Sequence, residues 1–191
     1  MIYSMHILFI TDNFPPESNA PALRTYDHAK EWIKMGIKVT IITTAPNFPE
    51  GKVYHGYKNH FFHTSNIDGI RVIRVISFIS ANEGFFLRIL DYVSFMFTSF
   101  IASFFVGKVT HIIATSPQFF SAISGWLISI FKRKPFIFEL RDIWPASIKA
   151  VSAMNNNYLY ALFERIEIFL YKKAYLIVSV TQSFKSELAN R

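Results

Sequence analysis

The stretch from residue 5 to residue 36 constrains the fold most, because a buried strand, a loop and a helix follow one another within it. Residues 5–10 form a short, nearly continuous apolar run, which is typical of a strand covered on both faces in a parallel sheet. Residues 11–20 hold Asp, Asn, Ser and two prolines, a composition that predicts a loop. Pro21 suits the first turn of the following helix, and Gly36 is expected to end it.

The loop between this first strand and helix is the first place to expect a ligand. In an open α/β sheet, the loop that leaves the carboxyl end of a strand borders the ligand crevice. The next helix aims free N–H groups and the positive end of its dipole at that crevice. The expected ligand is therefore an anion, with a diphosphate as the leading candidate.

The same alternation of strand and helix continues along the chain. Further strands are predicted at residues 37–43, 70–76, 110–115, 135–140 and 175–180, and helices at residues 84–106, 118–131, 158–173 and 182–191. This order predicts an α/β fold with a Rossmann-like parallel sheet, right-handed crossovers and helices on both faces. Arg71 and Arg74 interrupt the strand at residues 70–76, which predicts a sheet position partly open to solvent. No repeat or linker divides the chain, so we expect a single domain over residues 1–191.

The composition is that of a globular domain and excludes sites that depend on cysteine. The chain has 191 residues, of which 51% are hydrophobic, enough for one domain with a large core. It contains no cysteine, so disulfides and thiolate metal sites are excluded, in agreement with a reducing compartment. Its start shows no secretory signal pattern. The formal net charge of +7 predicts attraction to nucleic acid, anionic lipid headgroups or phosphorylated substrates, without choosing among them.

The most unusual segment covers residues 84–106, which are mostly apolar and nearly long enough to cross a bilayer. A thin polar stripe runs down one side and consists of Arg88, Asp91, Ser94, Thr98 and Ser103. Two charged residues close together are rare in a spanning helix. We therefore expect a helix packed on the sheet, with a helix at a membrane interface as the alternative.

Five short motifs occur in order along the chain. They are FPPE at residues 14–17, PNFPEGK at 46–52, DGIRVIRV at 68–75, ATSP at 114–117 and FELRDIWP at 138–145. Together they resemble the amino-terminal half of bacterial family-4-type glycosyltransferases of O-antigen, capsule and exopolysaccharide synthesis. The resemblance covers essentially the whole chain from residue 5 onward. It implies one half of a GT-B enzyme, in which two Rossmann-like halves face each other across a cleft.

The resemblance also implies a reaction. In this family the amino-terminal half mainly holds the acceptor, and the carboxyl-terminal half binds the nucleotide sugar. The implied reaction is a retaining transfer, without an essential metal or other cofactor, from a nucleotide-sugar donor such as a UDP-sugar to a glycan carried on a polyprenyl diphosphate. The family's E-x7-E signature belongs to the second half, and no acidic pair at that spacing occurs here. The nucleotide-sugar-binding domain is therefore expected to be absent from this chain, and the chain alone is expected to be inactive.

Candidate site residues gather at the predicted ends of strands and in the motifs. Arg141 and Asp142 follow a buried strand and are the candidate catalytic pair, because transfer needs an oriented acceptor hydroxyl and a stabilised leaving phosphate. The alternative for this pair is a structural ion pair beneath Trp144. The candidate substrate-binding residues are Asp12, Asn13, Glu17, Ser18, Asn19, Arg24, Asn47, Ser116, Pro117, Gln118, Trp144 and Thr181.

The first loop departs from the family pattern, since Ser18, Asn19 and Ala20 stand where adjacent glycines are usual. Glycine at such positions lets the backbone approach a diphosphate closely. Asn tolerates unusual backbone angles and Ser is small, so the loop is still a candidate for this role. Arg24 could give a guanidinium to a phosphate or carboxylate, or lie on the helix surface. Thr181 is also expected to cap the last helix.

Partners are predicted from charge and from the acceptor that the resemblance implies. Basic clusters at residues 132–134 and 172–173, together with the aromatic helix from Phe85, predict peripheral docking on anionic lipid at the cytoplasmic face of the plasma membrane. One rival is a noncatalytic scaffold module of a polysaccharide assembly complex. Another is a nucleic-acid-binding protein, but the chain lacks a basic readout helix and an RNP-type strand, so we expect no nucleic-acid partner.

Two further sets of polar residues are expected to have no chemical role. His55, His60 and His63 have no cysteine or close carboxylate partner in the sequence, so loop histidines are expected there and no metal site. Glu164 and Glu167 share a predicted helix and are expected on its solvated face.

Overall fold

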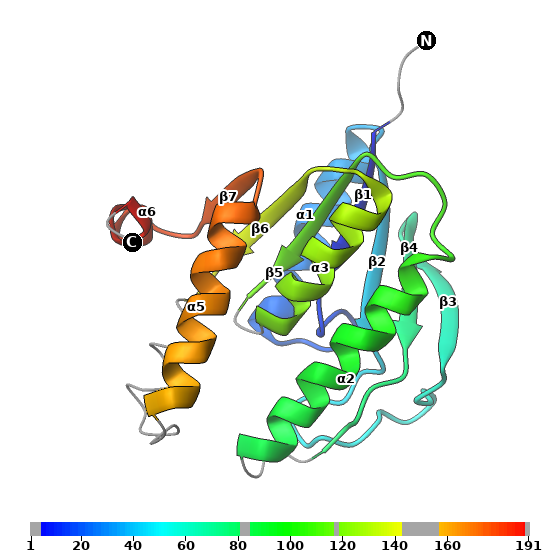
Figure 1. Ribbon diagram of the computed structural model, residues 1–191. Helices are drawn as coiled ribbons and strands as arrows, with labels where there is room; N and C mark the ends of the chain where they lie inside the picture. The colour runs from blue at the N-terminus through cyan, green and yellow to red at the C-terminus, as the bar shows by residue number, and fades with distance from the viewer. Residues whose placement is uncertain (1–4, 81–84, 117–118, 143–156, 190–191) are drawn as a thin grey trace.

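The computed structural model describes residues 5–80, 85–116, 119–142 and 157–189 as an α/β fold (Figure 1). Its strands are β1 (His6–Ile10), β2 (Lys38–Thr44), β3 (Phe62–Ile67), β4 (Ile70–Val75), β5 (His111–Thr115), β6 (Phe136–Leu140) and β7 (Leu176–Ser179). They form one sheet in the order β3-β4-β2-β1-β5-β6-β7. All neighbouring pairs are parallel except β3 and β4, which are antiparallel. The predicted Rossmann-like fold class is confirmed.

Helices cover both faces of this sheet (Figure 1). They are α1 (Ala20–Lys34), α2 (Phe85–Ser103), α3 (Phe119–Lys132), α5 (Asn157–Lys173) and α6 (Gln182–Ala189). One apolar cluster joins α1 to one face of the sheet, and another joins α2, α3 and α5 to the other face. Between the two layers, β1 is buried along its whole length, which is why its sequence is apolar apart from His6.

Pro21 and Gly36 mark the two ends of α1, as predicted, and Asn19, which was not predicted as a cap, closes its first turn. The side chain of Asn19 accepts a 3.0 Å hydrogen bond from the backbone N–H of Ala22, and Pro21 lies in the first turn. Asn19 has φ −72° and ψ 158°, an ordinary extended conformation that needs no glycine. Gly36, just after the helix, has φ +77°, a left-handed conformation that glycine adopts without strain.

The strand β3 was not predicted, and it adds one antiparallel strand at the edge of the sheet, beside the six predicted strands, which are parallel to one another. The sequence predicted no strand between residues 43 and 70. Instead β3 pairs with β4 through a two-residue turn at Asp68 and Gly69, both with positive φ. Asp-Gly in a tight hairpin is the sequence signal for this turn. The polar sequence FHTSNI concealed the strand, because β3 at the sheet edge has half its residues exposed.

The prediction that the strand with Arg71 and Arg74 is partly open to solvent is wrong for Arg74. β4 lies between β2 and β3, and Arg74 is only 4% exposed. Its guanidinium donates a hydrogen bond to the carbonyl of Pro15 and lies 5.2 Å from the ring centre of Tyr57. Arg74 therefore ties the first loop to the sheet, and its charge does not mark an exposed strand.

The expectation of a solvated face is also wrong for Glu167. Glu164 is partly exposed, but Glu167 is only 1% exposed. Phe163, Glu167 and Leu170 recur at helical spacing on the face of α5 that packs toward the sheet. Position on the helix decided the burial of this carboxylate.

Helix α2 packs one side against the core and exposes large apolar side chains on the other. It packs on β2, β4 and α3, as predicted, and Ser99 and Ser103 are fully buried, with the Ser99 hydroxyl 2.7 Å from that of Ser124. The opposite side exposes Phe86, Leu90, Phe97, Ile101 and Phe104. Of the described helices, α2 is the one whose length and composition would allow it to span a membrane.

Candidate functional site

The carboxyl ends of the parallel strands meet at one edge of the sheet, where the candidate residues follow them. They are Asp12 and Asn13 after β1, Asn47 after β2, Ser116 after β5, Arg141 and Asp142 after β6, and Thr181 after β7. Because β1 lies between β2 and β5, the first three of these segments are direct neighbours. Pro117, Gln118 and Trp144 lie outside the described residues.

An open pocket of about 400 Å³ lies at this edge. Its lining combines side chains of the first loop, the second loop and α2: Asp12, Asn13, Asn19, Asn47, Phe48, Arg88, Asp91 and Tyr92, with Pro21, Thr44 and Ser80 beside them. Four of the predicted binding residues are therefore brought together here. Arg88, Asp91 and Tyr92 were not predicted as site residues. The signal for them was the pair of charges in an otherwise apolar helix.

Two carboxyl groups in this pocket have perturbed acidity. Burial raises the pKa of Asp91 to about 7, and the nearby charge of Asp12 adds to the effect. Burial also raises the pKa of Asp12, and it raises that of the Tyr92 hydroxyl. No hydrogen bond joins the Asp91 carboxyl to another residue in the described part of the chain. A carboxyl that titrates near neutral pH can accept a proton from a bound hydroxyl group.

Glu17 holds the two loops of the pocket together and does not line it. Its side chain is buried, with 2% of the residue exposed. One carboxylate oxygen, Oε1, accepts hydrogen bonds of 2.9 Å from the backbone N–H groups of Asn47 and Phe48. The other, Oε2, accepts a 3.2 Å bond from the N–H of Phe14. Both carboxylate oxygens of Glu17 therefore accept hydrogen bonds from the backbone. Glu17 holds the two loops together, and neither oxygen is left for a substrate.

The asparagines of the pocket are positioned by the same loops. The amide group of Asn19 donates to the side-chain oxygen of Asn13, while its oxygen caps α1. The Asn47 amide donates a 2.9 Å hydrogen bond to the carbonyl of Ala45. Ser18 is exposed beside them and does not line the pocket. The loops thus present amide groups in fixed orientations.

Ser116 links the ends of β5 and β6. Its hydroxyl oxygen accepts hydrogen bonds from the backbone N–H groups of Arg141, at 2.7 Å, and Asp142, at 3.2 Å. No ion pair joins Arg141 to Asp142 within the described residues, so the structure does not show the alternative of a salt bridge between them. The Ser116 contact places both backbones at the carboxyl edge.

Arg24 and Thr181 lie apart from the pocket. The Arg24 Nε atom is 3.7 Å from the Oε1 atom of Glu139, a buried residue of β6 that the sequence analysis did not single out. Thr181 accepts a 3.2 Å hydrogen bond from the N–H of Phe184, which confirms its role as the cap of α6. It follows β7, three strand positions from β1.

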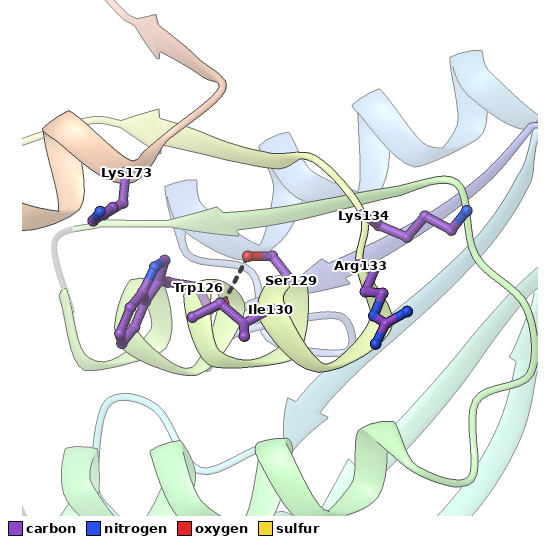
Figure 2. A pocket seen from close by; sticks show the side chains of 6 residues that line it. All are labelled: Trp126, Ser129, Ile130, Arg133, Lys134 and Lys173. Carbon is purple, nitrogen blue, oxygen red and sulfur yellow. Dashed lines mark hydrogen bonds between the residues drawn. The ribbon is translucent and has the colours of Figure 1, made fainter.

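A second pocket, of about 380 Å³, lies beside α3 toward the opposite edge of the sheet (Figure 2). Trp126 and Ile130 of α3 line it together with Arg133 and Lys134, which follow that helix, and Lys173 at the end of α5. Cations at the carboxyl ends of helices also stabilise the helix dipole. This pocket is therefore a cationic groove beside apolar surface, remote from the carboxyl edge.

Comparisons with known proteins add no family to this description. No family model matches the chain, and no curated protein matches it. Across the described residues, no three histidine, aspartate or glutamate side chains are grouped so that they could hold a metal ion. The assignment of function rests on the geometry of the carboxyl edge and on the resemblance of the motifs.

Proposed function

We propose that this chain is the acceptor-binding half of a retaining glycosyltransferase. The enzyme would transfer a hexosyl or N-acetylhexosaminyl group from a UDP-sugar to a polyprenyl-diphosphate-linked glycan in bacterial cell-surface polysaccharide synthesis. The observation that carries the proposal is the pocket at the carboxyl edge of the sheet, which is lined by amide and carboxyl groups. Such groups bind sugar hydroxyls, and this edge is where open α/β sheets hold ligands. The five motifs support the same assignment.

In this proposal the pocket holds the acceptor sugar. Asn13, Asn47 and Asp12 present the donors and acceptors that fix hydroxyl groups. Asp91 accepts a hydrogen bond from the reacting hydroxyl, because its raised pKa lets it take up part of the proton near neutral pH. Arg141 and Asp142 stand at the end of β6 as the candidate catalytic pair. The donor is bound mainly by a second domain outside residues 1–191, and no metal or other cofactor is invoked.

The proposed acceptor is anchored in lipid, so the enzyme is proposed to work at the cytoplasmic face of the plasma membrane as a peripheral protein. The exposed apolar side of α2 supports this, since large apolar side chains seldom line a whole helix face in water. At its carboxyl end the Phe104 ring lies 4.5 Å from that of Phe131. Lys108, Lys132 and Lys134 border these rings around an adjoining pocket of about 550 Å³. Exposed aromatics ringed by cations fit an anionic lipid surface.

Docking is tested by flotation with liposomes of anionic or neutral lipid. We expect binding to the anionic liposomes alone, weakened at high salt because screening removes the attraction to headgroups. The double variant Phe104→Ser, Phe131→Ser should lose binding, whereas Lys30→Gln on α1 should not. Salt-insensitive binding, or none, would count against docking by charge.

Transfer itself is tested with the protein from the complete open reading frame. A panel of nucleotide sugars is supplied with membrane extract as acceptor, and labelled lipid-linked product is measured. Asp91→Asn and Asn47→Ala should each lower kcat/KM for the acceptor at least tenfold. A tenfold loss corresponds to about 1.4 kcal/mol of transition-state stabilisation. Lys34→Gln at the exposed end of α1 is the matched control. No transfer from any donor would favour the alternative, a noncatalytic scaffold module of a polysaccharide assembly complex.

A further inference from the structure

Two arginines at the carboxyl edge carry buried N–H groups without partners. Among the described residues, the Nε and Nη2 atoms of Arg24 and the Nε and Nη1 atoms of Arg141 are buried and form no hydrogen bond. Native proteins leave few buried donors unpaired, and a guanidinium is a particularly costly one. Four such nitrogens on two side chains indicate a binding partner that supplies acceptor oxygens.

Glu139 lies beside Arg24 but does not satisfy its guanidinium. Its Oε1 atom lies 3.7 Å from both Arg24 Nε and His28 Nδ1, beyond hydrogen-bond length. Its Oε2 atom is buried without a partner in the described part of the chain. Arg141 follows Glu139 by two residues, so both leave the same face of β6, the face that carries α1. In an ordinary structural ion pair, the Glu139 oxygen and the arginine nitrogen would lie within hydrogen-bond distance of each other.

Charge and position specify the kind of ligand. Two guanidinium groups against one carboxylate leave a net positive charge. A guanidinium presents two parallel N–H groups that match the oxygens of a phosphate or a carboxylate. The cluster lies where β6 ends, at the edge where open α/β sheets bind ligands, and Ser116 fixes the backbone of Arg141 there.

We propose that Arg24 and Arg141 form an oxyanion subsite for a phosphate group of the substrate. In this arrangement both arginines donate to phosphate oxygens, and Glu139 Oε2 accepts a hydrogen bond from a hydroxyl group next to the phosphate. The subsite is separate from the pocket lined by Asp12 and Asp91, which binds uncharged hydroxyls. That the phosphate belongs to a substrate rests on the proposed function, whereas binding of an oxyanion does not.

The test is calorimetric titration of residues 1–191 with inorganic pyrophosphate, UDP and geranyl diphosphate at constant ionic strength. We expect saturable binding of pyrophosphate that weakens about tenfold in Arg24→Gln and in Arg141→Gln. Arg24→Lys keeps the charge but loses the paired donors, so it should bind more weakly than the parent. Glu139→Gln should bind pyrophosphate more tightly, because a like charge is removed. Tighter binding of UDP assigns the subsite to the donor, and tighter binding of geranyl diphosphate assigns it to the lipid carrier.

Arg133→Gln is the matched control, because it removes an exposed arginine at the opposite edge of the sheet. Circular dichroism of each variant separates loss of binding from loss of folding. Absence of saturable pyrophosphate binding overturns the subsite, and so does equal weakening by Arg133→Gln. If no sugar transfer is detected but pyrophosphate still binds, the result counts against the glycosyltransferase and not against the oxyanion subsite.

Discussion

The Glu17 carboxylate accepts a 2.9 Å hydrogen bond from the backbone N–H of Asn47, thirty residues further along the chain. The same carboxylate also accepts bonds from the N–H groups of Phe14 and Phe48. One buried side chain therefore holds the loop after β1 against the loop after β2. These two loops carry the FPPE and PNFPEGK motifs and form one wall of the candidate pocket.

Replacing Glu17 by Ala should destabilise the protein. The change leaves the backbone N–H groups of Phe14, Asn47 and Phe48 without their acceptor in a buried or partly buried place, and we expect the free energy of unfolding to fall by about 2–4 kcal/mol. Urea denaturation measures this difference. Glu50→Ala, at an exposed acidic residue of the second loop, should change stability by less than about 0.5 kcal/mol. Equal stability of the Glu17→Ala variant and the parent would refute the bracing role.

Asp91 should make stability depend on pH. Its pKa is about 7 in the folded protein and 3.8 in its ordinary state, so between these values the folded protein binds more protons than the unfolded chain. The free energy of unfolding should therefore fall as pH rises from about 4 to about 7, by on the order of 3 kcal/mol from this group.

The Asp91→Asn variant isolates that effect, since Asp12 and Glu17 remain in both proteins. Denaturant unfolding at several pH values should show that the stability of the variant relative to the parent increases with pH over this range. Parallel stability curves would show that the carboxyl is not desolvated in the folded protein.

Ser116→Ala should loosen the end of β6. The substitution removes the acceptor of the Arg141 and Asp142 backbone N–H groups, and we expect a loss of about 1–2 kcal/mol in the free energy of unfolding. Ser116→Thr keeps the hydroxyl and should recover part of the loss. If the alanine and threonine variants unfold at the same denaturant concentration, the hydroxyl is not the cause.

Gly125→Ala should strain the contact between α3 and β5. A methyl group at Gly125 would lie 2.7 Å from the Cβ atom of Ala114 and 3.1 Å from the ring of Phe136, so the helix must shift. Overpacking of this kind costs about 1–3 kcal/mol. Thermal or urea unfolding gives the value, and Gly107→Ala is the control because its methyl group would meet open space. A variant as stable as the parent would show that α3 can move away from β5 freely.

Local patterns predicted most of the secondary structure. The apolar run of β1, Pro21 in the first turn of α1 and the end of α1 at Gly36 depend on residues close together in sequence, and all three agree with the structure. β3 was missed because an edge strand needs no apolar run. The burial of Arg74 was missed because its partner is a carbonyl in a loop 59 residues away.

The candidate site could be predicted only in part. Asp12, Asn13 and Asn47 follow adjacent strands, so the fold class alone brings them to one edge. Asp91 joins them from α2, and no pattern along the sequence shows which loop the start of that helix will face. Its desolvation, and the pKa that follows from it, exist only after the pocket has formed.

By itself the sequence determined the alternation of strands and helices, because hydrophobic periodicity and capping act over a few residues. It thereby determined that the loops after parallel strands share one edge. Only the tertiary structure decided that Glu17 reaches Asn47, that Arg24 meets Glu139, and that Asp91 of α2 lines the candidate pocket. Contacts between distant residues depend on strand order and helix rotation, which are set by the packing of the whole core.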